Sequence, residues 1–235
     1  MERAVDIFSS PGTVYGEVAA LPVQSSSWVI PFLLTILIGI VSNIAILTNP
    51  ILRAQAMEPQ MQAMQERVDQ GKMTQEQADQ AKDMMGSSTF VMVIGIVTSV
   101  VMLSIMVFAG ALVFWLAVKF VYKVPVGYKK MLEVYGLPLM IGVLGGILTL
   151  LMIYLFNSIY ANPSGSLFVM ENFSRKNTVH MLLASLNVFS IWQMVVLGIG
   201  LSKVSNKSTG SGVGMAVGLW IVWIVIMVLL GKTLG

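Results

Sequence analysis

Five long runs of apolar residues divide this sequence, and their length constrains the fold more than any other feature. The runs cover, approximately, residues 28–47, 90–121, 134–156, 179–201 and 213–230. A helix needs about 20 apolar residues to cross the hydrocarbon core of a bilayer, and within lipid only helices and closed barrels satisfy every backbone polar group. Since the runs lack the alternation of apolar and polar residues typical of barrel strands, we predict an all-α polytopic membrane protein, a bundle of five transmembrane helices.

Charged residues are few and unevenly distributed. They make up 11% of the chain, less than half of the roughly 25% found in soluble domains, and 10 of the 25 lie between Thr48 and Thr89. This composition excludes a soluble globular domain. The chain contains no cysteine, which excludes a disulfide scaffold and a thiolate metal site. The net charge of +3 forms no basic stripe, so we expect no nucleic-acid partner.

The second run is longer than one crossing requires. Its 32 residues would span about 48 Å as a helix, so we expect one helix that tilts, bends near Gly110 or extends past the interface. A division into two spans is the alternative, but no polar turn lies inside the run.

Residues 1–27 contain no continuous apolar stretch, so we do not expect a signal peptide. Ser10-Pro11 suits the N-cap and first position of a short helix, on which Val14, Val18 and Leu21 would share one face. We predict that this helix lies at the membrane surface. A frayed tail is the alternative.

The orientation follows from the basic residues of the loops. Lys and Arg are equally numerous on the two sides of a five-span topology, but the short loops on the N-terminal side hold them at higher density. The segment 119–130 contains four lysines. By the positive-inside rule, we expect a cytosolic N-terminus and a C-terminus outside.

The segment 48–89 is polar and predicts a helical hairpin inserted between the first two spans. Four apolar residues recur at helical spacing and form a candidate partner face: Met57, Met61, Met64 and Val68. Gly71 suits the left-handed position that ends a helix, and Thr74 with Gln77 is typical of a capping box. Thioether sulfur can bind Cu(I), but methionine also occurs throughout the apolar runs, so we predict no metal site.

Three amide residues lie inside the apolar runs: Asn43, Asn187 and Gln193. Amides at this depth most often bridge helices by hydrogen bonds. We expect that role here, with Asn43 as a partner of the other two, and a solute path is the alternative. His180, the single histidine, lies at the edge of the fourth run, where we expect it to contact lipid headgroups.

Glycines repeat at a spacing of four residues in or beside two of the runs: Gly142 and Gly146, and Gly210, Gly214 and Gly218. Such faces let helix backbones approach closely. We predict that they pack helices within the monomer. A seam between two copies of the chain is the alternative.

The apolar runs hold no paired nucleophile and base and no carboxylate dyad, the groups that hydrolysis within a membrane requires. The sequence also lacks a zinc-binding His-Glu-x-x-His helix, a phosphate-binding glycine loop and a dinucleotide fingerprint. We therefore expect no catalytic residues and no cofactor, and we predict that the protein is not an enzyme.

Several short motifs follow one another in the order of a known family. They are Phe8-Ser-Ser-Pro11, Trp28-Val-Ile-Pro31, Tyr128-Lys-Lys-Met-Leu-Glu-Val-Tyr135-Gly136-Leu-Pro138, Ile191-Trp192 and Gly198-Ile-Gly-Leu201. The first precedes the first span, the second opens it, the third leads into the third span, and the last two lie in the fourth. This arrangement resembles bacterial members of the Yip (Ypt/Rab-interacting protein) domain family, Yip-one type, over nearly the whole chain.

The resemblance implies a five-span integral protein of a bacterial cytoplasmic membrane with a cytosolic N-terminus. Eukaryotic relatives are associated with Golgi and endoplasmic reticulum transport and with Rab GTPases, and some bacterial relatives resemble accessory subunits of export systems. The Asp-Leu-x-Gly-Pro signature of the eukaryotic relatives does not precede the first span here, so the Rab-linked role is not carried over.

Two functions from different classes remain. The first is a non-enzymatic membrane scaffold or accessory subunit that binds another membrane protein, such as an export ATPase or a transporter, with a homo-oligomer as a further option. The second is a small-solute permease or channel-like transporter whose path would pass Asn43, Asn187 and Gln193. The scarcity of charge inside the runs favours the first.

Overall fold

A computed structural model describes residues 2–86, 88–174 and 176–234. In this part of the chain every regular element is a helix: α1 (Glu2–Asp6), α2 (Pro11–Ala20), α3 (Ser26–Thr48), α4 (Pro50–Asp69), α5 (Gln75–Gly86), α6 (Ser88–Ala117), η1 (Val118–Tyr122), α7 (Tyr128–Gly136), α8 (Leu139–Phe156), η2 (Gly165–Asn172), α9 (Thr178–Ser185), α10 (Val188–Ser205) and α11 (Thr209–Leu234). Five of these segments are long and apolar enough to cross a membrane, namely α3, α6 with η1, α7 with α8, α10 and α11. The predicted all-α class with five spanning helices is confirmed.

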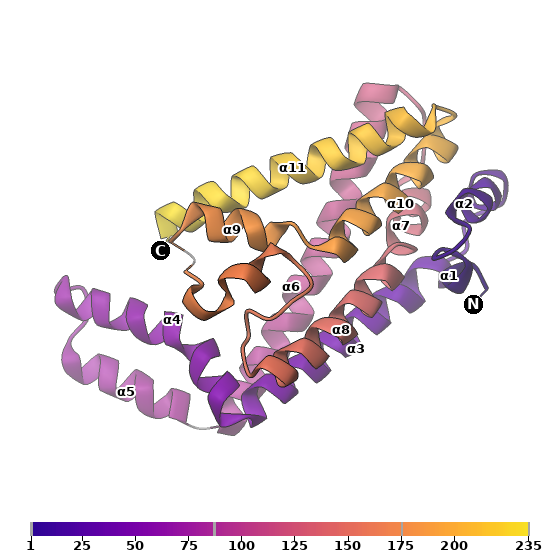
Figure 1. Ribbon diagram of the computed structural model, residues 1–235. Helices are drawn as coiled ribbons and strands as arrows, with labels where there is room; N and C mark the ends of the chain where they lie inside the picture. Colours follow the sequence, from indigo (N-terminus) through magenta and orange to yellow (C-terminus); the bar gives the residue numbers. More distant parts are fainter. Residues whose placement is uncertain (1, 87, 175, 235) are drawn as a thin grey trace.

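The bundle has two unlike ends (Figure 1). At the N-terminal end, α1, α2 and α7 lie beside the start of α3 and the turn between α10 and α11. At the far end, α4 and α5 extend away from the spanning helices, and η2 lies nearby. The main cluster of buried apolar side chains lies at the N-terminal end, where α2, α7 and α10 meet, and includes Tyr15, Val134 and Leu201. The N-terminal end is therefore the packed part of the molecule.

The second predicted span forms one helix rather than two. Together α6 and η1 provide a candidate crossing of 34 residues, Thr89–Tyr122. Gly110 of α6 faces Tyr135 of α7, whose ring and hydroxyl occupy the space that a Cβ at Gly110 would take. Since no side chain projects from α6 at this position, the tyrosine can pack directly against its backbone.

The fourth predicted span, residues 179–201, is not one helix in the structure. The chain forms α9, leaves helical geometry, and resumes as α10. The side-chain oxygen of Asn187 accepts hydrogen bonds from the backbone N–H groups of Phe189 (2.9 Å) and Ser190 (3.3 Å), which makes Asn187 the N-cap of α10. Because this amide begins a new helix, the fourth crossing runs over Val188–Ser205.

The third crossing begins earlier than the predicted residue 134. Its first part, α7, starts at Tyr128 and is joined to α8 through Leu137 and Pro138. Helix α7 contains the charged residues Lys130 and Glu133. A search for continuous apolar residues therefore could not detect it.

The polar segment between the first two spans forms the predicted helical hairpin, α4 and α5, which we call the arm. Gly71 has a φ of +68°, the left-handed geometry expected just after a helix. The Gln77 N–H donates to the Thr74 hydroxyl oxygen at 3.2 Å, and the Thr74 N–H donates to the Gln77 side-chain oxygen at 3.0 Å. The predicted capping box is therefore confirmed.

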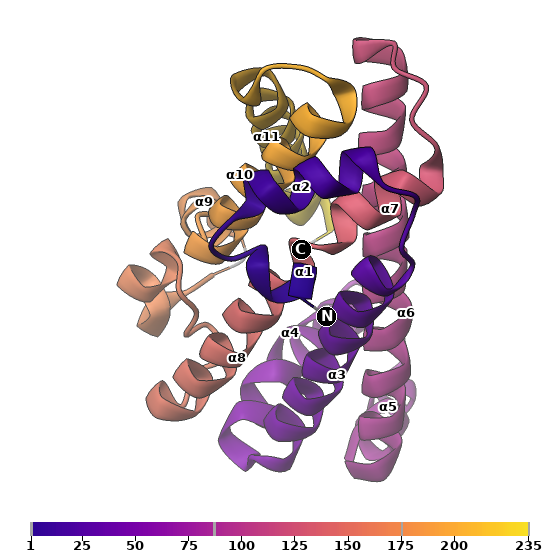
Figure 2. The ribbon, with the colours of Figure 1, turned by 90° about the vertical axis from the view of Figure 1, so that its right-hand side faces the viewer.

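The predicted N-terminal helix forms as α2, but its apolar face is covered by protein. Helix α2 packs across α10 and contacts α7 (Figure 2). Its buried residues are Val14, Tyr15 and Val18, whereas Leu21 is exposed. The predicted placement of this face on the membrane surface therefore differs from the structure, in which the apolar face of α2 packs against α10 and α7.

Candidate functional site

A buried cluster of charged side chains joins the N-terminal segment to α7. The carboxylate of Glu133, which is fully buried, accepts hydrogen bonds from the Arg3 guanidinium (3.3 Å) and the Lys130 ammonium (2.8 Å). The backbone N–H of Gln24 donates to the same carboxylate at 3.4 Å. Burial of a carboxylate is strongly unfavourable unless cations and donors compensate it. Here two cations and one backbone donor provide that compensation.

Lys130 also binds the backbone of the N-terminal segment directly. Its ammonium donates to the carbonyl oxygens of Val18 (2.7 Å) and Leu21 (2.9 Å). With the bond to Glu133, all three donors of the ammonium are used. The cluster therefore fixes the end of α2 and the following chain against α7, which positions the start of the first spanning helix.

Tyr15 provides a second, uncharged connection between the same elements. Its side chain is fully buried, and its hydroxyl donates to the carbonyl oxygen of Val134 at 2.9 Å. Burial raises the pKa of the Tyr15 phenol well above its usual value of 10.0, because desolvation disfavours the phenolate. The neutral phenol is therefore the form that fits the folded protein.

Tyr15→Phe is expected to destabilise the protein by about 1–2 kcal/mol, because the Val134 carbonyl would lose its donor inside a buried contact. A phenol whose pKa is raised in the folded state stabilises that state fully below the unfolded pKa, and this contribution is lost as the pH rises through the folded pKa. Thermal unfolding of the purified chain should consequently lose stability above about pH 10, and less so in Tyr15→Phe. An identical pH profile in both proteins would contradict this role of Tyr15.

Helices α10 and α11 approach each other closely where two glycines face the neighbouring backbone. A Cβ built at Gly212 would overlap the carbonyl oxygen of Gly198 and come within 2.8 Å of the Ser202 backbone nitrogen. A Cβ at Gly198 would in turn overlap the backbone of Val213. Two glycines on facing helices thus allow backbone-to-backbone contact. The sequence pattern singled out Gly198 only as part of a family motif, and it did not single out Gly212.

The predicted glycine faces differ in what they contact. A Cβ at Gly146 would come within 2.8 Å of Ile38 on α3, and one at Gly142 would lie 3.5 Å from the Gln193 side chain on α10. These two glycines do pack helices within the chain. A Cβ at three others would meet no atom within 4 Å: Gly210, Gly214 and Gly218. These three glycines therefore do not pack against another helix of the chain. The contact of α11 with α10 is made by Gly212, on the opposite face of α11.

The three amides predicted inside the spans lie in three separate contacts. Asn43 of α3 faces α6, where its side-chain nitrogen is 3.5 Å from the Ser99 hydroxyl. Gln193 lies beside Gly142, and Asn187 caps its own helix. The expected partnership of Asn43 with the other two is therefore wrong, because α3 turns this residue toward α6.

The arm is tied to the far end of the bundle by polar contacts. The Gln55 amide donates to the carbonyl oxygen of Asn157 (2.9 Å) and accepts from the Ile159 N–H (3.0 Å). Further along α4, Glu66 pairs with Lys176 at 3.1 Å. These links hold α4 against the segment between α8 and α9, so the arm has a defined direction relative to the spanning helices.

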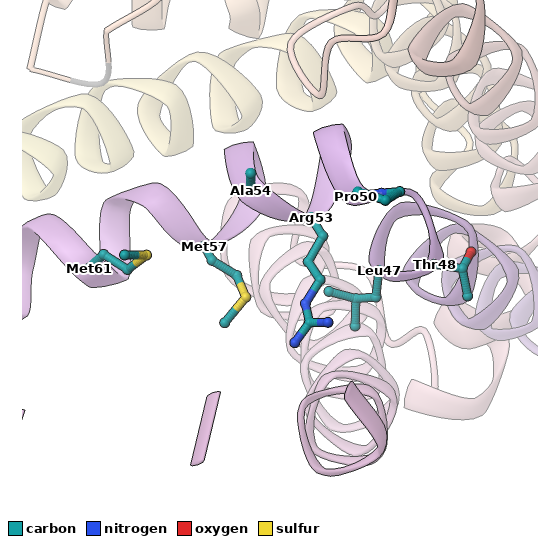
Figure 3. A pocket seen from close by; sticks show the side chains of 7 residues that line it. All are labelled: Leu47, Thr48, Pro50, Arg53, Ala54, Met57 and Met61. Carbon is teal, nitrogen blue, oxygen red and sulfur yellow. The ribbon is translucent and has the colours of Figure 1, made fainter. Parts of the chain in front are cut away.

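A groove lies at the root of the arm, where α3 ends and α4 begins (Figure 3). Its volume is about 340 Å³, and its described lining residues are Leu47, Thr48, Pro50, Arg53, Ala54, Met57 and Met61. The predicted partner face is therefore divided. Met57 and Met61 line the groove, whereas Met64 and Val68 are half-buried further along α4.

His180 does not stand alone at the edge of the fourth run. Its Nδ1 accepts a hydrogen bond from the Ser174 N–H at 3.1 Å, and its ring lies 6.0 Å from that of Phe173. Within the described ranges, no group of three or more His, Asp or Glu side chains could hold a metal ion.

Comparison with known proteins adds one finding. The profile of the Yip1 domain matches residues 5–230. The matched range includes the arm, the candidate spans, and Lys130 and Glu133 of the charged cluster, whereas Arg3 precedes it. No curated protein and no solved structure matches the chain.

Proposed function

This chain belongs to the Yip1 domain family, and from that premise we propose that it is a non-enzymatic membrane scaffold or accessory subunit that binds another membrane protein. The five candidate spans provide the anchor. The arm supplies the contact surface outside the bundle.

The observation that carries the proposal is the exposure of methionine side chains on both helices of the arm. Met61 on α4 is 47% exposed and Met84 on α5 is 56% exposed, although both lie on helices that are otherwise rich in glutamine and charge. Methionine adapts to irregular apolar surfaces and is common at binding sites. Because the arm is held in place by Gln55 and Glu66, it can present these side chains without the large ordering penalty that a flexible segment would bring.

A transport function has less support from the arrangement of the polar residues. A path through the bundle would need amides that line one continuous space, and Asn43, Asn187 and Gln193 occupy three separate contacts. The test is reconstitution of the protein into liposomes. If the protein carried a solute flux that Asn187→Leu abolished while the variant remained folded, a permease would be favoured over a scaffold.

The proposal is tested by crosslinking the chain in native membranes, purifying it and measuring how much partner membrane protein is recovered with it. Met61→Asp is expected to reduce this recovery about tenfold or more, because an unpaired carboxylate would enter the centre of the contact. Met84→Asp should act in the same direction. Ala63→Asp is the matched control, since Ala63 is exposed and lies about 200° around α4 from Met61. Equal recovery from all three variants would refute the arm as the contact surface.

A further inference from the structure

Lysine side chains gather where η1 and the turn between α10 and α11 lie side by side (Figure 1). The Tyr122 hydroxyl donates to the carbonyl oxygen of Ser211 at 2.7 Å and lies 2.9 Å from the Ser211 hydroxyl, which joins positions 89 residues apart in the chain. The contact brings two basic loops together. The exposed side chains of this surface, which we call the basic end, are Lys119, Phe120, Val121, Lys123, Lys203 and Lys207.

Aromatic rings lie beneath two of the ammonium groups. The Nζ atom of Lys119 is 4.9 Å from the centre of the Trp115 ring, and that of Lys207 is 5.8 Å from the centre of the Tyr122 ring. The Trp115 indole N–H donates to the carbonyl oxygen of Val126 at 2.7 Å, so this ring is fixed in place. An aromatic face attracts a cation without neutralising it, and the lysines therefore keep their charge at a defined position.

The acidic residues of the chain do not compensate this charge locally. The sequence contains no Asp or Glu in residues 118–132 or 172–235. Glu133, the next acidic residue, is fully buried in the charged cluster described above, and Glu17 on α2 pairs with Arg3. The basic end thus presents a positive charge that suits an anionic partner.

The length of the second crossing assigns this surface to the depth of the lipid headgroups. The 34 residues of α6 and η1 are about 51 Å long, about 20 Å more than the hydrocarbon core requires. Lys119 is the only charged residue among them. Because a charged side chain within the hydrocarbon is costly, the end that carries Lys119 is the end that leaves it.

An exposed apolar strip of α6 runs into the basic end. Leu112, Leu116 and Phe120 are all exposed, and their spacing of four residues places them on one helix face. Phe120 is 68% exposed and Val121 is 67% exposed, although both lie between lysines. A surface that is apolar along the helix and basic at its end matches a phospholipid, whose acyl chains continue from its phosphate. An acidic soluble protein would match only the lysines.

We propose that the basic end binds the headgroups of anionic phospholipids. The four lysines contact the phosphates, while Phe120 and Val121 enter the edge of the hydrocarbon beside them. Clusters of about four to eight basic residues next to a spanning helix attract anionic lipids, and lysine binds phosphate as a compact charge on a flexible stem. The surface contains no residue of the arm, so it does not depend on the scaffold function proposed above.

The test is native mass spectrometry of the delipidated full chain, titrated with phosphatidylglycerol or with phosphatidylcholine. Lys119→Gln combined with Lys207→Gln is expected to weaken phosphatidylglycerol binding about twenty-fivefold, because each basic residue near an anionic surface contributes about fivefold. Binding of zwitterionic phosphatidylcholine should change little. Lys72→Gln combined with Lys82→Gln removes the same charge from the arm and should leave both lipids unaffected. Arginine at positions 119 and 207 keeps the charge and should retain the binding, which excludes loss of folding as the cause.

Phe120→Ser tests the apolar part of the surface, because it leaves all four lysines in place. It is expected to weaken both lipids, since both carry acyl chains. Unchanged phosphatidylglycerol binding in the glutamine variant of Lys119 and Lys207, or equal losses in that variant and in the arm variant, would overturn the proposal. Complete displacement of phosphatidylglycerol by millimolar inorganic phosphate would overturn it in favour of a soluble anion.

Discussion

Gly212→Leu is expected to prevent α10 and α11 from packing and to leave little correctly folded protein. The obstacle is backbone, since a Cβ at Gly212 overlaps the Gly198 carbonyl oxygen and approaches the backbone nitrogen of Ser202. A flexible side chain could rotate away, but two helix backbones must separate along their length. We expect a loss of more than about 3 kcal/mol, at or above the upper end of overpacking effects, measured as the thermal stability and monodispersity of the detergent-purified chain.

Gly214→Leu is the matched control, because it adds the same side chain to the same helix. A Cβ at Gly214 meets no atom within 4 Å, and leucine has the higher helix propensity. We expect its stability to stay within about 1 kcal/mol of the parent. If Gly214→Leu changed self-association at unchanged stability, the exposed glycine face would be a seam between copies. Similar damage from both substitutions would contradict the assigned packing of α11.

Glu133→Gln is expected to release the N-terminal segment from α7. The substitution keeps the size of the side chain but leaves Arg3 and Lys130, whose side chains are only 13% and 17% exposed, without their buried anion. Removing one partner of a buried ion pair typically costs about 3–5 kcal/mol. The expected result is faster proteolysis between α2 and α3, together with a lower unfolding temperature of the purified protein.

Glu17→Gln separates this effect from a general effect of charge. Glu17 pairs with the same arginine at 3.1 Å, but its side chain is 53% exposed. Exposed ion pairs contribute about 0–1 kcal/mol, so the N-terminal segment should stay docked. If proteolysis accelerated equally in Glu17→Gln and Glu133→Gln, burial of the cluster would not be what holds the segment.

Local signals in the sequence predicted the arm accurately. The bonds of Thr74 with Gln77 and the positive φ of Gly71 depend on neighbours within a few residues, and their spacing is visible in the sequence. Asn187 offered a comparable local signal, because asparagine is a favoured N-cap. The hydropathy of the surrounding residues concealed it, and the fourth span was predicted as continuous.

The charged cluster could not be predicted in the same way. Lys130 and Glu133 are three residues apart on α7, so their pairing is visible once that helix is recognised. Arg3, however, is separated from Glu133 by 130 positions. Only the packing of α2 across α10 and α7 brings the arginine to the carboxylate.

The sequence by itself determined that the chain has five segments long and apolar enough to cross a bilayer, because the length of an apolar run must match the thickness of the hydrocarbon core. The tertiary structure alone decided which face of each helix meets another helix. In water, the apolar face of a helix is the buried face, but in lipid the outward face is equally apolar. The glycine spacing of α11 therefore marked a face without showing its neighbour, and the structure placed Gly212, not Gly214, against α10.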